Sequence, residues 1–109
     1  MMNHNTILED IVRRLKHNKS KYDLVYKCEE FSLLNGDCGE IDIYKLMPDR
    51  REVWAIEVKR SKDKQQRAQL QLLRDLDYMK EKYDIDTVKT FFAYADKNCR
   101  RGYYVTEVK

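Results

Sequence analysis

The chain contains 109 residues, of which 42% are hydrophobic and 38% are charged. This balance is typical of a globular protein and argues against an intrinsically disordered chain. The length suits one domain and is too short for two independent cores, so we expect a single domain over residues 1–109. The formal net charge is only +3, which does not by itself indicate a nucleic-acid partner.

Basic residues are nevertheless concentrated in two segments. Arg13–Lys21 contains five Lys or Arg residues and no acid, and Lys59–Arg67 contains five against one Asp. Either segment suits a phosphate backbone, although solvated helix faces often carry similar charge. The cysteines are odd in number and show no zinc-binding spacing, which favours a reduced, intracellular protein. No apolar run is long enough to span a bilayer and the N-terminus is polar, so we expect neither a membrane segment nor export.

The first predicted elements are a helix and two strands. Thr6 followed by Glu9 reads as a capping box, and apolar residues at helical spacing then predict a helix from Thr6 to His17. Alternating apolar residues predict a strand over Tyr22–Cys28, and a turn-rich stretch separates it from a second strand over Glu40–Leu46.

The central predicted feature is a hairpin. Pro48 and Asp49 are good turn residues, and Glu52–Lys59 is rich in strand-forming residues. If the hairpin is symmetric about Asp49 and Arg50, paired residues have numbers that sum to 99.

A second helix and two further strands complete the predicted fold. Residues 61–83 have helical periodicity, and the apolar stripe is predicted to contain Leu72, Leu73, Leu76, Met79 and Tyr83. The last strands are predicted over Thr87–Ala95 and Tyr103–Val108. The order α-β-β-β-α-β-β predicts an α/β fold with a mixed central sheet flanked by helices, either one on each face or both on one. Trp54, Phe91 and Phe92 are expected in the core of this fold rather than on a base-stacking surface.

The hairpin register brings charged side chains together. It places Asp42 opposite Glu57 and Glu40 opposite Lys59, whereas Ile41 and Ile43 share the other face of their strand. Adjacent carboxylates repel each other, and a divalent cation would neutralise them. Oxygen ligands without a His or Cys set favour Mg²⁺, with Mn²⁺ as a substitute. A surface cross-strand ion cluster is the alternative interpretation.

Three further residues near the predicted cation, Val58, Lys59 and Glu40, are candidates for roles in the site. The backbone carbonyl of Val58 lies between Glu57 and Lys59 and is a further candidate ligand. Lys59 would orient the attacking water and stabilise charge on a phosphate. Glu40 is either a further metal neighbour or a partner of Lys59.

The sequence GEID at Gly39–Asp42, followed by IEVKR at Ile56–Arg60, resembles the PD-(D/E)xK nuclease superfamily. It is most similar to archaeal Holliday-junction-resolvase-like proteins and small virus-type replication-repair nuclease domains. The resemblance implies a restriction-endonuclease-like core in which Asp42 and Glu57 bind Mg²⁺ and Lys59 assists hydrolysis. Ile41 stands in place of the proline in the superfamily's name.

The resemblance also implies roles for residues on the helices. Many members place a metal-binding Glu on the first helix, which matches Glu9, although the capping box explains Glu9 equally well. Members often carry a catalytic Gln on the helix after the E-x-K strand. Gln69 is the leading candidate, ahead of Gln65 and Gln71. Leu73 stands where a Tyr would follow in the helicase-linked branch.

The leading hypothesis is a metal-dependent nuclease that hydrolyses DNA, in particular a structure-selective endonuclease. A small domain covers little of a duplex, and the resemblance implies a homodimer with two active sites. One alternative is a non-catalytic nucleic-acid-binding module or accessory subunit, and a weaker one is a protein-interaction domain. The residues predicted to contact DNA phosphates are Arg13, Arg14, Lys62 and Arg67.

Overall fold

Helix α1 spans His4–His17 in a computed structural model that describes residues 2–108. Asn3 is the N-cap, and its Oδ1 accepts hydrogen bonds from the Thr6 backbone N–H (2.8 Å) and the Thr6 hydroxyl (2.9 Å). The predicted capping box between Thr6 and Glu9 is therefore wrong, because Asn3 already satisfies the N–H groups at the start of the helix. Thr6 lies inside the first turn.

The remaining elements follow the predicted order. The strands are β1 (Leu24–Ser32), β2 (Cys38–Met47), β3 (Glu52–Lys59), β4 (Thr87–Ala95) and β5 (Tyr103–Val108). Helix α2 spans Gln65–Lys82, and short 3₁₀ turns occupy Pro48–Arg50 and Lys62–Lys64. No helix among residues 2–108 is long and apolar enough to cross a bilayer.

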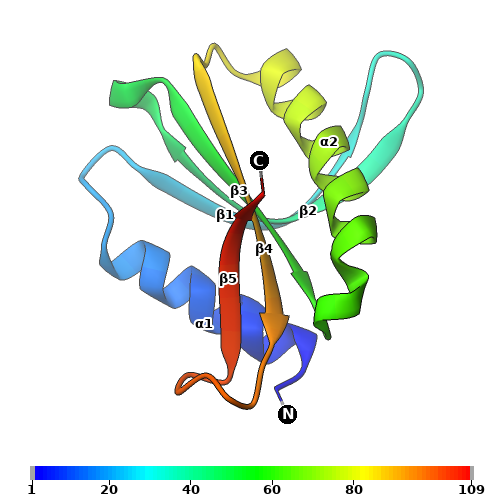
Figure 1. Cartoon of the computed structure of the whole chain (residues 1–109). Coiled ribbons are helices and arrows are strands. Elements are labelled where there is room, and N and C mark those ends of the chain that lie inside the picture. Colours follow the sequence, from blue (N-terminus) through cyan, green and yellow to red (C-terminus); the bar gives the residue numbers. More distant parts are fainter. Residues whose placement is uncertain (1, 109) are drawn as a thin grey trace.

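The five strands form one mixed sheet in the order β1-β2-β3-β4-β5 (Figure 1). Only the β3–β4 pair is parallel, and α2 provides the crossover that a parallel pair requires. The predicted hairpin register is confirmed, since β2 and β3 pair from Ile43↔Ile56 to Met47↔Glu52. Each of these pairs sums to 99, as the symmetric turn requires.

Each face of the sheet is covered by one helix. Ile43, Ile56 and Val58 pack with the apolar stripe of α1, whereas Tyr44 and Val53 pack with α2 on the other face. The two helices consequently lie on opposite sides of the strands (Figure 1). Of the two helix arrangements that the sequence permits, the structure has the one with a helix on each face.

The buried stripe of α2 differs from the predicted one. Its buried residues are Ala68, Leu72, Asp75 and Met79, whereas Leu73 is 60% exposed. The prediction followed the leucines, but the sheet contacts a face of the helix rotated away from Leu73. An aspartate therefore lies in the middle of the helix–sheet interface.

A polar network ties the C-terminal half of α2 to β1. The Glu29 carboxylate accepts hydrogen bonds from the hydroxyls of Tyr44 (2.9 Å) and Tyr78 (2.7 Å), and from Lys82 Nζ (3.1 Å). The Tyr44 hydroxyl also lies 2.9 Å from that of Tyr83. Burial alone would raise the pKa of Glu29, but these hydrogen bonds outweigh it and hold the pKa below its ordinary value.

Glu29→Ala is expected to lower the free energy of unfolding by about 1–3 kcal/mol, because Tyr44 is fully buried and loses a charged acceptor. Urea denaturation would measure the change. Glu30→Ala is the matched control, since Glu30 is an exposed neighbour on the same strand, and it should change the unfolding free energy by less than about 0.5 kcal/mol. Equal losses in both variants would contradict a structural role for the network.

Candidate functional site

Asp42 lies where strands β1 and β2 bend. Its ladder partner would be Cys28, but regular pairing skips this position, and Cys28 has a left-handed backbone with φ of 55°. Contrary to expectation, Ile41 packs in the cluster under α2 while Ile43 packs under α1. The strands bend here and carry the hairpin tip toward α2 (Figure 1). The bend breaks the side-chain alternation at Asp42.

The Asp42 carboxylate is held from two sides. Its Oδ2 accepts a hydrogen bond from the Val58 backbone N–H (2.8 Å) and lies 3.3 Å from His4 Nε2 at the start of α1. Asp42 is 7% exposed. The β2–β3 ladder ends at Ile43↔Ile56, so contact with β3 continues beyond that point through the side chain of Asp42.

Glu57 and Asp75 join Asp42 to form a buried group of three carboxyls, which we call the acidic cluster. Glu57 is on β3 and faces α2, where it meets Asp75, and each of the two residues is only 1% exposed. The Glu57 carboxyl lies within hydrogen-bonding reach of both Asp42 and Asp75. Glu57 Oε2 and Asp75 Oδ2 are buried without any hydrogen-bond partner among the described residues.

The acidic cluster is electrostatically unfavourable when fully ionised. Burial raises the pKa of Glu57, and the charge of Asp42, a hydrogen bond with it and the charge of Asp75 raise it further. Burial also raises the pKa of Asp75, an effect that a hydrogen bond with Glu57 only partly offsets. Lys59 lowers both pKa values through its positive charge. The cluster must therefore hold protons or a cation near neutral pH.

Burial decides between the two interpretations of the Asp42–Glu57 pair. A surface cross-strand ion cluster requires exposed groups, and neither carboxylate is exposed. That alternative is wrong. Lys59, two residues after Glu57 at the end of β3, is partly buried and acts on the cluster electrostatically.

The donor chemistry of the acidic cluster suits a hard divalent cation. All its donors are carboxylate oxygens, and two of these oxygens have no partner within residues 2–108. In the same range, no three His, Cys, Asp or Glu side chains are arranged as a complete metal site. Val58, predicted as a carbonyl ligand, contributes its backbone N–H to Asp42.

Three helix residues, Glu9, Gln69 and Gln71, were candidates for the site, and their surroundings differ. Glu9 is exposed and forms an ion pair with Lys27 Nζ (2.6 Å). Gln69 borders a groove between α2 and strands β4 and β5, and Asp75 does not line this groove. Gln71 lies one turn before Asp75, and its Oε1 is buried without a partner among the described residues.

Two of the four predicted phosphate contacts already have acidic partners. Arg13 and Arg14 both pair with Asp10 on α1, and the distance from Arg14 Nε is 2.9 Å. Lys62 and Arg67 are exposed where η2 (Lys62–Lys64) leads into α2.

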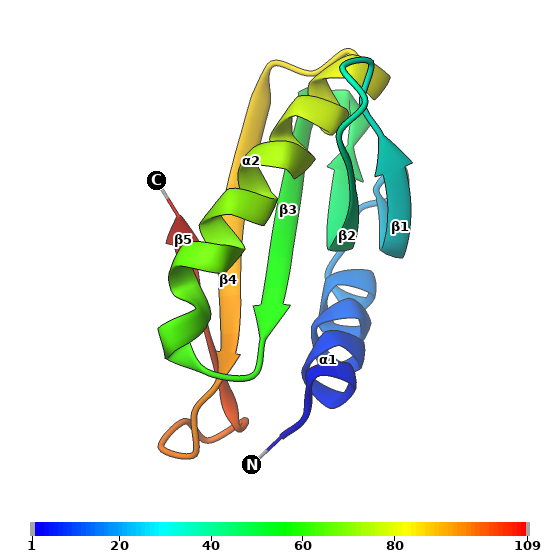
Figure 2. The ribbon, with the colours of Figure 1, turned by 90° about the vertical axis from the view of Figure 1, so that its right-hand side faces the viewer.

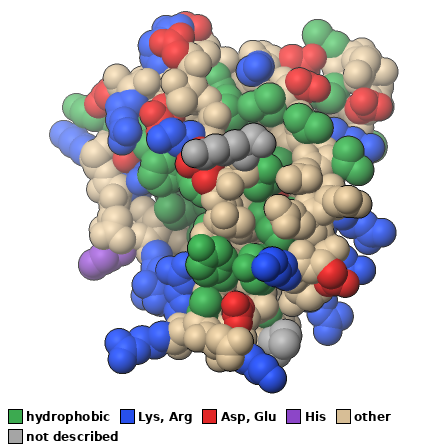
Figure 3. Space-filling view, viewed as in Figure 1, with side chains coloured by type: hydrophobic (Ala, Val, Ile, Leu, Met, Phe, Trp, Pro, Cys, Tyr) green, Lys and Arg blue, Asp and Glu red, His purple; other side chains and the backbone are tan. Residues whose placement is uncertain are grey.

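The loop between β4 and β5 is basic and lies at the same end of the molecule as the acidic cluster. The end of β3, the start of α2 and the β4–β5 loop meet there (Figures 1 and 2). In the space-filling view, Lys and Arg side chains lie at both ends, whereas few Asp and Glu side chains are visible toward this end (Figure 3). The loop contributes three exposed cations: Lys97, Arg100 and Arg101.

Sequence reasoning missed His4 and Asp75. His4 precedes the predicted start of the first helix, so no face could be assigned to it. Asp75 did carry a signal, because it lies three residues after Leu72 and four before Met79, which is the spacing of one helix face.

Comparison of the chain with protein-family models, curated proteins and solved structures found no match in any of the three.

Proposed function

We propose that the protein is a Mg²⁺-dependent nuclease with a restriction-endonuclease-like core and the PD-(D/E)xK plan, acting on DNA as a structure-selective endonuclease. The observation that carries the proposal is the acidic cluster. Asp42 and Glu57 converge in a buried position beside Lys59, and the Glu57 Oε2 atom has no partner among the described residues. Buried charges without partners are costly, so such an arrangement usually serves a function.

Each residue of the site has a separate task in this proposal. Asp42 and Glu57 would hold the cation, and the hydrogen bond from Val58 N–H keeps the Asp42 carboxylate oriented. When bound, Mg²⁺ would polarise the scissile phosphate and lower the pKa of an attacking water. Lys59 would contribute positive charge beside the phosphate as negative charge develops there. Asp75 would hold the proton that Glu57 must release to bind a cation.

The exposed cations around this end of the molecule support a nucleic-acid substrate. Lys62 and Arg67 follow the end of β3, and the β4–β5 loop adds Lys97 and Arg100 close to the same end. Such cations would contact phosphates on either side of the cleaved bond. A homodimer would supply two such sites for a branched DNA, and this step rests on the resemblance to the PD-(D/E)xK nucleases.

Cleavage of a labelled DNA panel tests the proposal. The panel contains duplex, single-stranded, flap and four-way-junction DNA with Mg²⁺ or Mn²⁺, and EDTA serves as the metal-free reference. We expect metal-dependent products, with at least a ~100-fold loss of rate in Lys59→Ala because a charge beside the phosphate is removed. The matched control is Lys80→Ala, an exposed lysine on α2, which should cleave at the unmodified rate.

The same panel separates the nuclease from a non-catalytic binding module. Salt-sensitive DNA binding without cleavage under either metal, unchanged by Lys59→Ala, would establish the binding module and reject the nuclease. Absence of both cleavage and DNA binding at low salt would favour a protein-interaction domain.

A further inference from the structure

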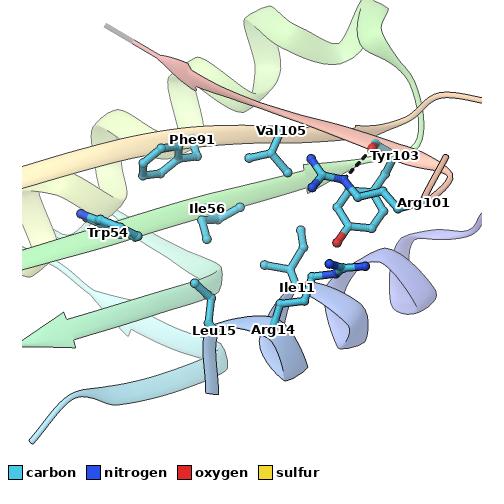
Figure 4. A pocket seen from close by; sticks show the side chains of 9 residues that line it. All are labelled: Ile11, Arg14, Leu15, Trp54, Ile56, Phe91, Arg101, Tyr103 and Val105. Carbon is cyan, nitrogen blue, oxygen red and sulfur yellow. Dashed lines mark hydrogen bonds between the residues drawn. The ribbon is translucent and has the colours of Figure 1, made fainter. Parts of the chain in front are cut away.

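A cavity of about 190 Å³ lies between α1 and strands β3, β4 and β5. It is on the opposite face of the sheet from Glu57, because Ile56 lines it and neighbouring residues of a strand point to opposite faces. The cavity therefore takes no part in the proposed phosphodiester chemistry. Its walls are mostly apolar, and its two ends differ in character (Figure 4).

One end of the cavity is aromatic. Trp54 and Phe91 meet with ring centroids 5.6 Å apart and planes inclined by 60°. Trp54 is fixed by its indole N–H, which donates to Glu52, and by Lys45, whose Nζ lies 5.4 Å from the ring centroid. Phe92 is fully buried, as the sequence predicted, but Trp54 and Phe91 are only partly buried. Their rings form a rigid, accessible wall.

The other end of the cavity is cationic. Arg101 donates through Nε to the Tyr103 carbonyl (3.1 Å), and its guanidinium lies 4.7 Å from the Tyr103 ring centroid. Arg14 reaches the same end from α1, where Asp10 offsets its charge. The Tyr103 hydroxyl also donates to Asp10 (2.7 Å). Arg101 has no acidic partner among residues 2–108, so this end carries a net positive charge.

We propose that this cavity binds a small ligand that combines a flat aromatic body with a carboxylate or phosphate. The ring would stack on one of the two aromatic side chains, Trp54 or Phe91, and meet the other at an angle. The anion would bind the terminal nitrogens of Arg101 with support from Arg14. Aromatic walls favour flat rings, and guanidinium groups bind carboxylate and phosphate in two-point contacts. A cavity of about 190 Å³ can enclose one or two fused rings, and the remainder of a larger ligand would lie outside it. A nucleoside monophosphate and an aryl carboxylate share this chemistry.

Binding can be followed through Trp54, because it is the only tryptophan of the chain. Its single indole N–H gives one resolved signal in a ¹H–¹⁵N NMR spectrum. The full chain is titrated with adenosine monophosphate and with 2-naphthoate, and separately with their uncharged counterparts, adenosine and 2-naphthamide. We expect a saturable shift with at least one anion, with a dissociation constant of roughly 10 μM to 1 mM, and at least ~10-fold weaker binding of its uncharged counterpart. Which anion binds identifies the ligand source.

Variants test whether the shift comes from this cavity. Arg101→Gln should weaken binding of the anion at least ~5-fold. The matched control is Arg74→Gln, because Arg74 is an exposed arginine on α2, and this substitution should leave binding unchanged. Val105→Phe should fill the cavity and remove binding. Glu57→Gln should bind the aromatic anion with unchanged affinity, because Glu57 faces the other side of the sheet. Failure of the nuclease proposal would therefore leave this proposal intact. No saturable shift, equal binding of charged and uncharged ligands, or unchanged affinity in Arg101→Gln would overturn the proposal.

Discussion

Glu57→Gln is expected to reduce DNA cleavage at least ~1,000-fold and to make the metal-free protein more stable. The loss of activity follows because an amide binds Mg²⁺ far more weakly than a carboxylate does. The gain in stability follows because the substitution keeps the size of the side chain and removes a buried carboxyl that must take up a proton on folding at neutral pH. We expect a gain of about 1–3 kcal/mol in unfolding free energy at neutral pH.

Opposite effects of one substitution on activity and stability distinguish a functional carboxylate from a structural one. Cleavage rates and urea denaturation in EDTA measure the two quantities on the same preparation. Glu81→Gln on the exposed surface of α2 is the matched control, and it should change neither. A Glu57→Gln protein that is destabilised, with cleavage lost only in proportion to unfolding, would show that Glu57 supports the fold rather than the chemistry.

The metal-free protein is expected to lose stability as pH rises through the neutral range, and Mg²⁺ is expected to restore it. The pKa of Asp75 is raised to about 7, and the pKa of Glu57 is also raised, so the folded protein holds protons that the unfolded chain releases. The contribution of Glu57 and Asp75 to stability is therefore greatest below the ordinary carboxyl pKa of about 4. It falls as the pH rises toward the raised pKa values of the folded protein. Each unit of raised pKa corresponds to about 1.4 kcal/mol.

Carboxyls with lowered pKa values act in a different pH range. Asp10, Asp23 and Glu29 have pKa values below the ordinary range because hydrogen bonds outweigh their burial. Their contribution is lost only under acid conditions, below about pH 4. Between about pH 5.5 and pH 8 the acidic cluster should dominate the change, with a loss of about 2–4 kcal/mol.

Thermal unfolding at several pH values, with and without excess MgCl₂, measures this linkage. The increase in Tm caused by Mg²⁺ should be larger at about pH 8 than at about pH 6, because the cation then replaces fewer protons. The double variant Glu57→Gln/Asp75→Asn should remove most of the pH dependence and the Mg²⁺ effect. A Mg²⁺ effect that persists in the double variant would place cation binding elsewhere.

The sequence predicted most of the sheet. The bounds of β3, β4 and β5 are as predicted, because each strand is a run of apolar and β-branched residues ended by turn residues. The β2–β3 register was also predictable, because a short turn containing Pro48 fixes which residues face each other. Asp42 and Glu57 were placed together for this reason, although their burial was not predicted.

The contributions of the helices to the site were harder to predict. Burial of Asp75 depends on which face of α2 contacts the sheet. The four leucines of α2 do not lie on a single face, so they do not determine that face. The role of Asn3 as N-cap, which brings His4 beside Asp42, depends on one side-chain hydrogen bond that competes with the Thr6 capping box. The bend at Cys28 has no sequence signal, since Cys rarely adopts a left-handed backbone.

That bend also changes the shape of one edge of the sheet. Strand β1 is at the edge of the sheet, where exposed backbone groups can pair with another chain and start aggregation. The left-handed backbone at Cys28 interrupts the regular edge, and the charged residues Lys27 and Glu30 flank it. A second strand would have to match this irregular backbone and bring its own side chains past those charges. The distortion beside Asp42 thus also hinders pairing of a second chain along the β1 edge of the sheet.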